Sequence, residues 1–457
     1  RSAAWAWGAR GSVSQFYFRD QTSTKFIDAS RPEINAEPDN SVNLNQLLTN
    51  ADITLSGGND RRQIQFRASG AYALDFRSNG KDIRSLTALY LDYAENDLNL
   101  SLRLGRQTRN SAGVLGRFDG ALLGWRAKPK LRFNLVAGFP VLSSRQTYIL
   151  RDRFFYGASM DLGGRRDTFQ TTVYWFDQRA TGGFTDRQSV GIEARFLKSK
   201  FNAFTIIDYD VKFRKLNLGL LTLNYTFPDT SNFSVTADYR QSPLLTTSNA
   251  LIGQINPVTF QAVDGLRGLR EFFTDPQIYQ LARDRTLTAR SLTMNYSRPL
   301  TKKLQANLDF TLSDTGGSPE SGGVPAMPPT GTEYYYGAQL VGSGMLWEND
   351  IYMLGARYSD TERSRTYTAD FNARIPVTSK FRLSPRVRFG LRKDKLIESD
   401  FRQLQPTMRM NYYPMRHAEI EVEVGGNFSR QRTTTAGVLN TTKETGFVLS
   451  AGYRLDF

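Results

Sequence analysis

The sequence predicts an all-β protein, built as a single closed antiparallel transmembrane β-barrel of about 22 strands, within a range of about 16–26. Three observations predict this fold. Apolar and polar residues alternate along most of the 457 residues. The connections between the alternating segments are short at one end and often long at the other. No apolar run reaches the length of about 18 residues that a transmembrane helix needs.

The alternation has a period of two, which gives each strand one apolar and one polar face. It is clearest in segments 98–105, 304–313 and 367–375; in the first of these, leucine occupies every second position from Leu98 to Leu104. Such segments are roughly 10–14 residues long, which is enough for a tilted strand to cross a bilayer. A soluble β-propeller or β-helix would show a repeat of fixed period, and the sequence has none.

The connections alternate in length, and this alternation indicates which end of the barrel faces the periplasm. Short turns beside long loops are typical of outer-membrane barrels. With an even number of strands, both termini lie on the short-turn, periplasmic side. The predicted turns are 57–60, 94–97, 128–130, 163–167, 197–200, 228–232, 298–302, 376–380 and 414–417, and the predicted long loops are 19–46, 140–151, 242–284, 314–332 and 429–443.

The composition excludes much enzyme chemistry. The chain has no cysteine and one histidine, so disulfides, thiolate metal sites and multi-histidine sites are excluded. His417 falls in a predicted turn, and we expect a turn residue there and not a catalytic base. We therefore expect no enzymatic activity, no cofactor and no metal site. Aromatic and basic residues mostly fall on opposite strand faces, which argues against nucleic acid as a partner.

The last strand carries a recognisable pattern. Phe447, Leu449, Ala451, Tyr453, Leu455 and Phe457 alternate with polar or small residues, and the sequence stops on Phe457. This segment resembles the final strand of bacterial outer-membrane β-barrel proteins, whose terminal aromatic residue is recognised by the barrel-insertion machinery. The resemblance implies a Gram-negative outer-membrane location, with Tyr453 and Phe457 as the insertion signal. It also implies contact with outer-membrane lipid and lipopolysaccharide.

Aromatic residues are expected to form two belts at the membrane surfaces, because amphipathic rings favour the headgroup level. The alternative to membrane belts is that these aromatic residues reflect only the general preference of aromatic residues for strands. The belt residues are Trp5, Trp7, Trp125 and Trp347 at predicted periplasmic strand ends, and Tyr334 and Tyr336 at a predicted outer end.

Two charged arrays are predicted to line the lumen, since charges facing lipid would be costly. They form either a positive track for anions or a lateral charge network that stiffens the wall; the net charge of +15 slightly favours the track. By hairpin counting, Arg409 should lie at about the height of Glu419 and Glu421. The arrays comprise Arg374, Arg382, Arg386, Arg388, Arg392 and Arg409 on the basic side, and Asp370, Glu419, Glu421 and Glu423 on the acidic side.

Two long loops stand out within the barrel, which spans 1–457. Segment 242–284 departs from the period of two and has helical spacing, with Asp275 predicted to cap a helix that runs to Arg283. We expect it to form a lid or a constriction, against the alternative of an ordinary surface loop. Segment 314–332 is rich in glycine and proline and is expected to be mobile. The lid or constriction residues are Leu266, Arg267, Leu269, Arg270 and Phe273.

The width expected of about 22 strands, the arginine-rich interior and the abrupt start at Arg1 favour a wide conduit for an anionic polymer. In these features the chain broadly resembles the exopolysaccharide-export barrels. One alternative is a general, anion-selective diffusion porin for small anions. Another is a structural barrel that sheaths or anchors a partner protein complex for secretion or electron transfer. The start at Arg1 has no secretory signal, so either a signal has been removed or the chain is the C-terminal part of a longer protein. We expect the second, with a periplasmic region before Arg1.

Overall fold

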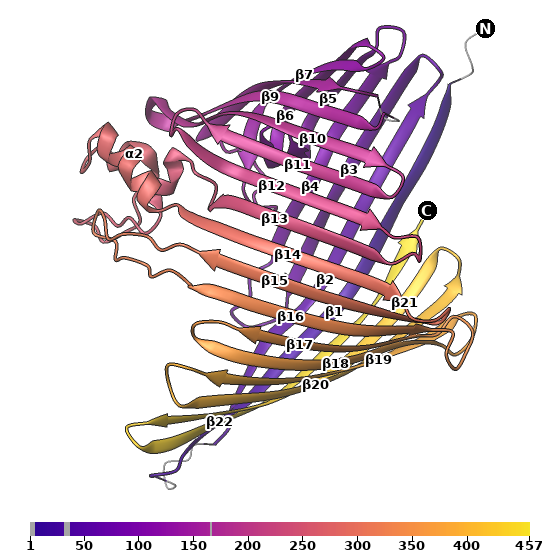
Figure 1. The fold of residues 1–457 in the computed structure, drawn as a ribbon, viewed down its shortest axis with the longest axis vertical. Coiled ribbons are helices and arrows are strands. Elements are labelled where there is room, and N and C mark those ends of the chain that lie inside the picture. Colours follow the sequence, from indigo (N-terminus) through magenta and orange to yellow (C-terminus); the bar gives the residue numbers. More distant parts are fainter. Residues whose placement is uncertain (1–4, 32–36, 165–166) are drawn as a thin grey trace.

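The computed structural model describes residues 5–31, 37–164 and 167–457. They form one antiparallel sheet of 22 strands, in which each strand pairs with the next along the chain and β1 also pairs with β22 (Figure 1). The strands are β1 (Ala6–Asp28), β2 (Asp39–Gly58), β3 (Arg62–Asp75), β4 (Ile83–Glu95), β5 (Leu100–Ser111), β6 (Val114–Lys128), β7 (Leu131–Val141), β8 (Arg153–Leu162), β9 (Phe169–Ala180), β10 (Phe184–Lys198), β11 (Phe201–Asp210), β12 (Lys215–Thr226), β13 (Asn232–Ser242), β14 (Leu287–Pro299), β15 (Leu304–Thr315), β16 (Thr332–Ser343), β17 (Ile351–Asp360), β18 (Ser364–Pro376), β19 (Phe381–Asp394), β20 (Ser399–Met415), β21 (Ala418–Thr435) and β22 (Val438–Asp456).

The barrel closes between its first and last strands. β1 and β22 pair from Ser12 opposite Asp456 to Asp28 opposite Asn440. The backbone N–H of Gly11 donates to the carbonyl of Phe457 at 2.8 Å, and the N–H of Phe457 donates back at 3.0 Å. The predicted closed barrel of 22 strands is confirmed, and both termini lie at the short-turn end.

Opposite faces of the wall differ in polarity, as the alternation predicts. Register places Phe371 of β18 opposite Val387 of β19, and the next pair, Asn372 and Arg386, on the other face. Phe371 and Val387 are exposed on the outside of the sheet. A ring of apolar side chains around a closed wall satisfies the backbone internally and presents hydrocarbon to lipid. None of the helices in the described residues has the length and hydrophobicity to cross a membrane.

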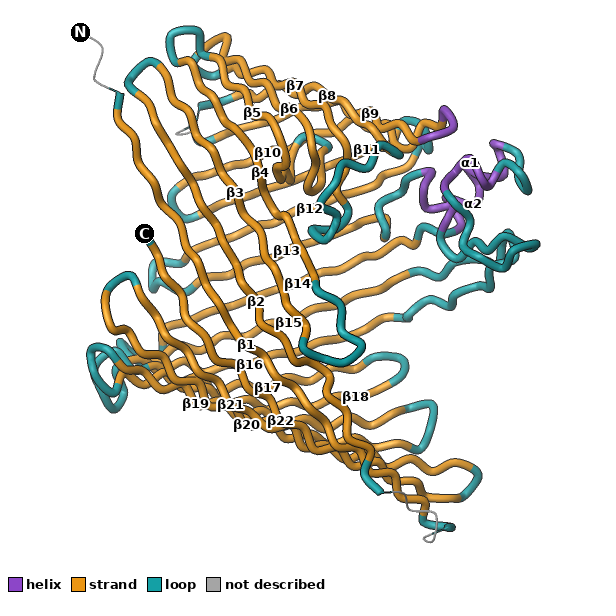
Figure 2. The backbone as a smooth tube through the Cα atoms, turned by 180° about the vertical axis from the view of Figure 1, so that it is seen from behind, coloured by secondary structure: helices purple, strands orange, loops and turns teal. Residues whose placement is uncertain are grey.

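The strands tilt strongly, so that β1–β4 on one side of the barrel cross β13–β18 on the other (Figure 2). In the described ranges, short helices lie at the ends of strands, beyond β9 and β13. They are the 3-10 turns η2 (Thr181–Gly183) and η3 (Thr247–Leu251), and the α-helices α1 (Gly265–Leu269) and α2 (Asp275–Asp284).

Two of the predicted long loops are wrong. Most of 19–46 and of 429–443 belongs to β1, β2, β21 and β22, whose lengths are 23, 20, 18 and 19 residues. These strands continue past the apolar band, where polar and charged residues occupy both faces. The period of two therefore fades although the ladder continues. The other three long connections are confirmed at 142–152, 243–286 and 316–331.

The wall is incomplete between β4 and β5. These strands pair only from Leu89 opposite Arg106 to Glu95 opposite Leu100, so the extracellular half of β4 lacks a partner strand on that side. Segment 142–152 fills the gap. The N–H of Leu86 donates to the carbonyl of Ser144 at 2.8 Å, and Arg106 donates to the carbonyl oxygens of Gln146 and Tyr148. The free edge of β4 is thus covered by loop backbone.

Candidate functional site

The predicted arginine ladder lies on the inner face of β19. Arg382, Arg386, Arg388 and Arg392 occupy every second or fourth position, and their neighbours on the other face from Phe381 to Leu391 are apolar. Arg386 lies opposite Asn372 of β18 and Thr407 of β20, and Arg388 lies opposite Asp370 and Gln405. Lumen-facing polar residues therefore surround the ladder on both neighbouring strands.

The ladder is unpaired in its extracellular half. Arg386, Arg388 and Arg392 are exposed, and none of them has an ion-pair partner among the described residues. Arg392 lies over the ring of Phe401, with its guanidinium carbon 5.3 Å from the ring centroid. Asp370 is opposite Arg388 in register but makes no ion pair with it. The extracellular half therefore keeps its full positive charge toward the lumen.

Its periplasmic half is neutralised. Arg382 donates to the hydroxyl of Tyr413 at 2.5 Å and lies 3.9 Å from Glu419. Arg409 binds Glu423 at 2.6 Å and lies 3.6 Å from Glu421. The lateral network predicted for the arrays is thus present here.

Arg409 lies opposite a residue of β21 that is two positions beyond the predicted pair of glutamates. The sequence placed it level with Glu419 and Glu421, whereas register places it opposite Glu423. An irregularity in the β20–β21 ladder between Tyr412 and Met415 shifts the strands, and hairpin counting could not include it. Glu419 is satisfied instead by Asn411 at 2.8 Å and by the hydroxyl of Tyr413 at 2.9 Å.

Arg374 is exposed and, among the described residues, has no hydrogen-bond or ion-pair partner. It lies on β18 opposite Ile351 of β17. Arg374 thus extends the unpaired positive surface beyond β19, as the sequence predicted for its flank.

The opposite wall holds a buried network that sequence reasoning missed. Arg187 of β10 donates to Asp208 of β11 at 2.6 Å and to the carbonyl of Gly113 at 2.8 Å, and Asp208 accepts from the hydroxyl of Tyr174 at 2.7 Å. Arg187 and Asp208 are 3% and 1% exposed. Tyr174, Arg187 and Asp208 lie on three consecutive strands, β9 to β11, and Gly113 lies in the turn between β5 and β6. Because each partner is on a different strand or turn, no spacing within one segment could reveal the network.

An aromatic cluster lies beside this network on the inner side of the wall. Phe118, Phe155 and Phe176 of β6, β8 and β9 are buried together, with ring centroids 5.2 Å apart in both neighbouring pairs. Arg187 lies over the ring of Phe176, 4.9 Å from its centroid. The open part of the lumen is therefore narrower than the strand number suggests, and it is bounded on one side by the unpaired arginines.

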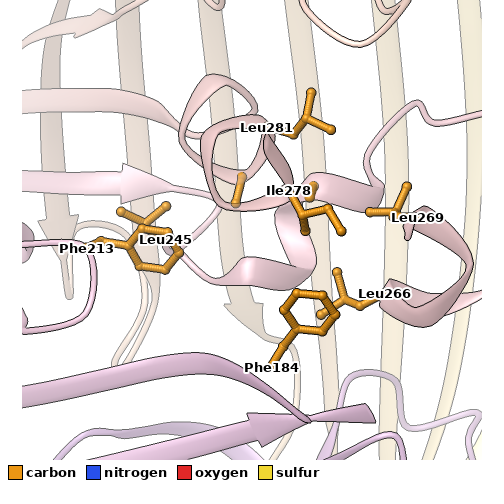
Figure 3. Close-up of a cluster of buried hydrophobic side chains, with 9 residues drawn as sticks. Phe184, Phe213, Leu245, Leu266, Leu269, Ile278 and Leu281 are labelled. Atoms are coloured by element: carbon orange, nitrogen blue, oxygen red, sulfur yellow. The ribbon is translucent and has the colours of Figure 1, made fainter. Parts of the chain in front are cut away.

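The segment 243–286 packs onto the extracellular rim. Leu266, Leu269 and Ile278 are buried against Phe184 from β10 and Phe213 from the β11–β12 turn (Figure 3). Phe273 packs against the same cluster, and the exposed Arg267 does not take part. Burial of the apolar face of this segment explains its helical spacing. Whether it acts as a lid or a constriction stays a prediction.

Polar contacts fix the segment in place. Arg270 donates to Asp275 at 2.8 and 2.9 Å and to the carbonyl of Gly182 at 2.8 Å. The predicted N-cap is wrong by one residue: Thr274 caps α2 and forms a capping box with Gln277, and Asp275 is the first helical residue.

The glycine-rich segment lies against this loop. Arg285 donates to the hydroxyl of Ser321 at 2.9 Å and to its carbonyl at 2.5 Å, and Gln254 donates to the carbonyl of Gly322 at 3.0 Å. The predicted mobility of 314–332 is a separate property and stays a prediction.

The predicted belt residues lie at or near the ends of strands, and their role as membrane belts stays a prediction. Trp5 and Trp7 are 5.9 Å apart at the start of β1, and Trp125 stacks on Phe133 at 6.1 Å at the periplasmic end of β6. Trp347 is exposed in the 344–350 turn.

At the outer end, Tyr334 and Tyr336 are exposed on β16, and Tyr336 stacks on Tyr358 at 6.0 Å. Tyr453 and Phe457 are also exposed on the outer face. Their role as an insertion signal stays a prediction.

Within the described part of the chain, no group of histidine, cysteine or acidic residues could hold a metal ion. The closed wall, its apolar outer face and its polar lumen define a β-barrel of the Gram-negative outer membrane, with an arginine-rich interior.

No family model matches the sequence, and no curated protein matches it. Similar solved structures include Pseudomonas aeruginosa OpdQ, at 10% identity and a TM-score of 0.41, covering 98% of both chains. Pseudomonas aeruginosa OccK2 (OpdF) in complex with glucuronate has 9% identity, a TM-score of 0.42 and 98% coverage of both chains. A BenF-like porin from Pseudomonas fluorescens Pf-5 has 8% identity, a TM-score of 0.41 and 99% coverage of both. The barrel fold follows from the strand pairing of this chain and does not rest on these likenesses.

Proposed function

We propose that the barrel is an anion-selective diffusion channel for small anionic solutes. The observation that carries this proposal is the row of exposed, unpaired arginines, Arg386, Arg388 and Arg392, along the inner face of β19. Basic side chains that line a pore select anions, and a low-dielectric wall focuses their field. The paired arginines, Arg382 on β19 and Arg409 on β20, contribute little, because acidic residues of β21 balance them locally.

The export of an anionic polymer, which the sequence favoured, has no support in the structure. That hypothesis depended on a wide bore, an arginine-rich interior and an expected periplasmic region. The buried cluster around Phe118, Phe155 and Phe176 occupies one side of the lumen, and 243–286 packs on the rim above β10 and β11. An open region beside one basic wall suits small anions better.

The test is the ion selectivity of the purified barrel in planar bilayers under a salt gradient. We expect a reversal potential on the anion side, and a shift toward neutral selectivity in the double variant Arg386→Gln/Arg388→Gln. The matched control is Arg84→Gln/Arg290→Gln, which removes the same charge from exposed residues on the outer face.

The expected size of the shift follows from Coulomb's law. An anion at roughly 7 Å from one arginine in water gains about 0.6 kcal/mol, which screening at 0.1 M salt reduces to about 0.3 kcal/mol. Loss of both arginines should thus lower anion enrichment about threefold, and less as the salt concentration rises. Cation selectivity of the wild type, or an equal shift in the control variant, would overturn the proposal.

A further inference from the structure

A row of basic residues crosses adjacent strands on the outer face of the barrel. Arg402 of β20 lies directly opposite Arg430 of β21, which lies opposite Lys443 of β22, which lies opposite Lys25 of β1. Like charges directly opposite one another destabilise a sheet. Four in succession therefore call for a counter-charge from outside the protein.

The row faces the membrane and not the lumen. Two residues further toward the periplasm on the same strand faces lie Leu404 and Phe428, which are exposed apolar side chains opposite each other in register. Along β21 the outward residues are apolar from Ile420 to Phe428, and Arg430 follows directly. These eight residue steps extend about 26 Å along the strand. On a strand tilted by about 40° they cover about 20 Å of height, which is most of the apolar band of about 25 Å of such barrels. Arg430 thus lies at its extracellular edge.

The row lines a shallow groove. The groove has a volume of about 270 Å³, with Phe389, Leu404 and Phe428 on its apolar side and Arg402, Arg430 and Lys443 on its basic side. Phe389 also borders a larger apolar depression of about 690 Å³ that extends across the outer faces of β13–β18. The surface therefore offers a basic site joined directly to an acyl-sized apolar one.

The protein itself supplies little negative charge to the outer side of the groove. Glu444 also lines it, but its carboxylate accepts a hydrogen bond at 3.1 Å from Asn427 on the lumen face. Asp400 lies 3.6 Å from Arg402. Within the described ranges Arg430, Lys443 and Lys25 have no ion-pair partner, and all three are exposed. Asp400 also lies opposite Arg432, a further cation on the same face. At least two cations of the groove thus remain unbalanced.

We propose that this groove binds a phosphorylated glycolipid of the outer leaflet, namely lipopolysaccharide. Neighbouring strands are about 4.8 Å apart, so the three cations of the groove span about 10 Å and can contact one phosphate group together. Arginine binds phosphate through paired hydrogen bonds, and lysine adds a point charge. The acyl chains lie on Phe389, Leu404 and Phe428. This proposal is independent of the channel function, because the groove and the lumen are on opposite faces of the wall.

The experiment measures binding of bisphosphorylated lipid A to the purified barrel in detergent, by native mass spectrometry. The variant Arg402→Gln/Arg430→Gln/Lys443→Gln should bind at least ~10-fold more weakly. The control Arg84→Gln/Arg290→Gln/Lys128→Gln removes the same charge outside the groove and should bind like the wild type. Arg402→Lys/Arg430→Lys keeps the charge and should restore most of the affinity.

Thermal unfolding of the barrel gives a second readout that a merely structural role would not produce. Without lipid, the triple variant should be at least as stable as the wild type, because it lacks the like-charge repulsion. With lipid A, the wild type should gain more stability than the variant. Equal binding by wild type and triple variant overturns the proposal. So does equal binding of dephosphorylated lipid A, and so does displacement by inorganic phosphate alone, which would indicate a free-phosphate site.

Discussion

The docking of 243–286 on the barrel rim depends on a few buried side chains, and Ile278 tests this dependence most directly. Ile278 is 0% exposed and lies in α2 at the centre of the cluster that joins the segment to Phe184 and Phe213. The change Ile278→Ala removes most of this side chain without adding a polar group. Replacing a buried isoleucine by alanine costs about 2–5 kcal/mol.

This cost should act on the docking equilibrium, because the barrel wall is held by its own ladder. The population of undocked segment is then expected to rise by roughly 30-fold to roughly 5,000-fold. Backbone hydrogen exchange of 275–284 in detergent micelles measures this population directly, and we expect faster exchange in α2 with unchanged exchange in the strands.

The control is Ile255→Ala in the same segment. Ile255 is 59% exposed, so its replacement should change stability by less than about 0.5 kcal/mol and leave the exchange of α2 unaltered. Unchanged exchange of α2 in Ile278→Ala would refute the reasoning that burial holds the segment on the rim. A uniform rise of hydrogen exchange across the strands would refute the assumption that docking of the segment is independent of the stability of the wall.

Two further predictions concern buried charges. Arg187→Met leaves Asp208 buried beside Tyr174 only, and should lower barrel stability by about 3–5 kcal/mol, whereas adding Asp208→Asn should recover much of the loss. Urea unfolding in lipid measures the stability of both variants. Equal unfolding midpoints for Arg187→Met and the wild type would contradict the expected loss of stability. In the 344–350 turn, burial raises the pKa of Asp350, but hydrogen bonds from the N–H groups of 345–347 outweigh burial and hold the pKa below its ordinary value of 3.8. The stability that Asp350 gives the turn is thus complete above pH 3.8 and lost as the pH falls below this pKa; Asp350→Asn should abolish that pH dependence of amide exchange.

The alternation of apolar and polar residues predicted the strands of the barrel wall well. The period of two identified the inner faces of β19 and β21, because a strand exposes alternate residues whatever its neighbours are. It also predicted the turns, since glycine, proline and charged residues interrupt the alternation there. The C-terminal aromatic residue marked the strand that closes the barrel.

Contacts between residues of different strands could not be predicted from the sequence. The contact of Arg409 with Glu423 follows from an irregularity near Tyr412, which changes the register without changing the alternation. Arg187 and Asp208 meet across β10 and β11 and bury each other, and neither has a local signal. The row from Arg402 to Lys25 became visible only from the register of adjacent strands.

The gap between β4 and β5 has a mechanical consequence. A closed ladder fixes the circumference of a barrel, because any change requires breaking hydrogen bonds along a whole strand. In the extracellular half of this wall the ladder is replaced by Arg106 and the backbone of 142–152. Strain on the barrel should therefore concentrate at this seam, where the fewest backbone hydrogen bonds join neighbouring strands.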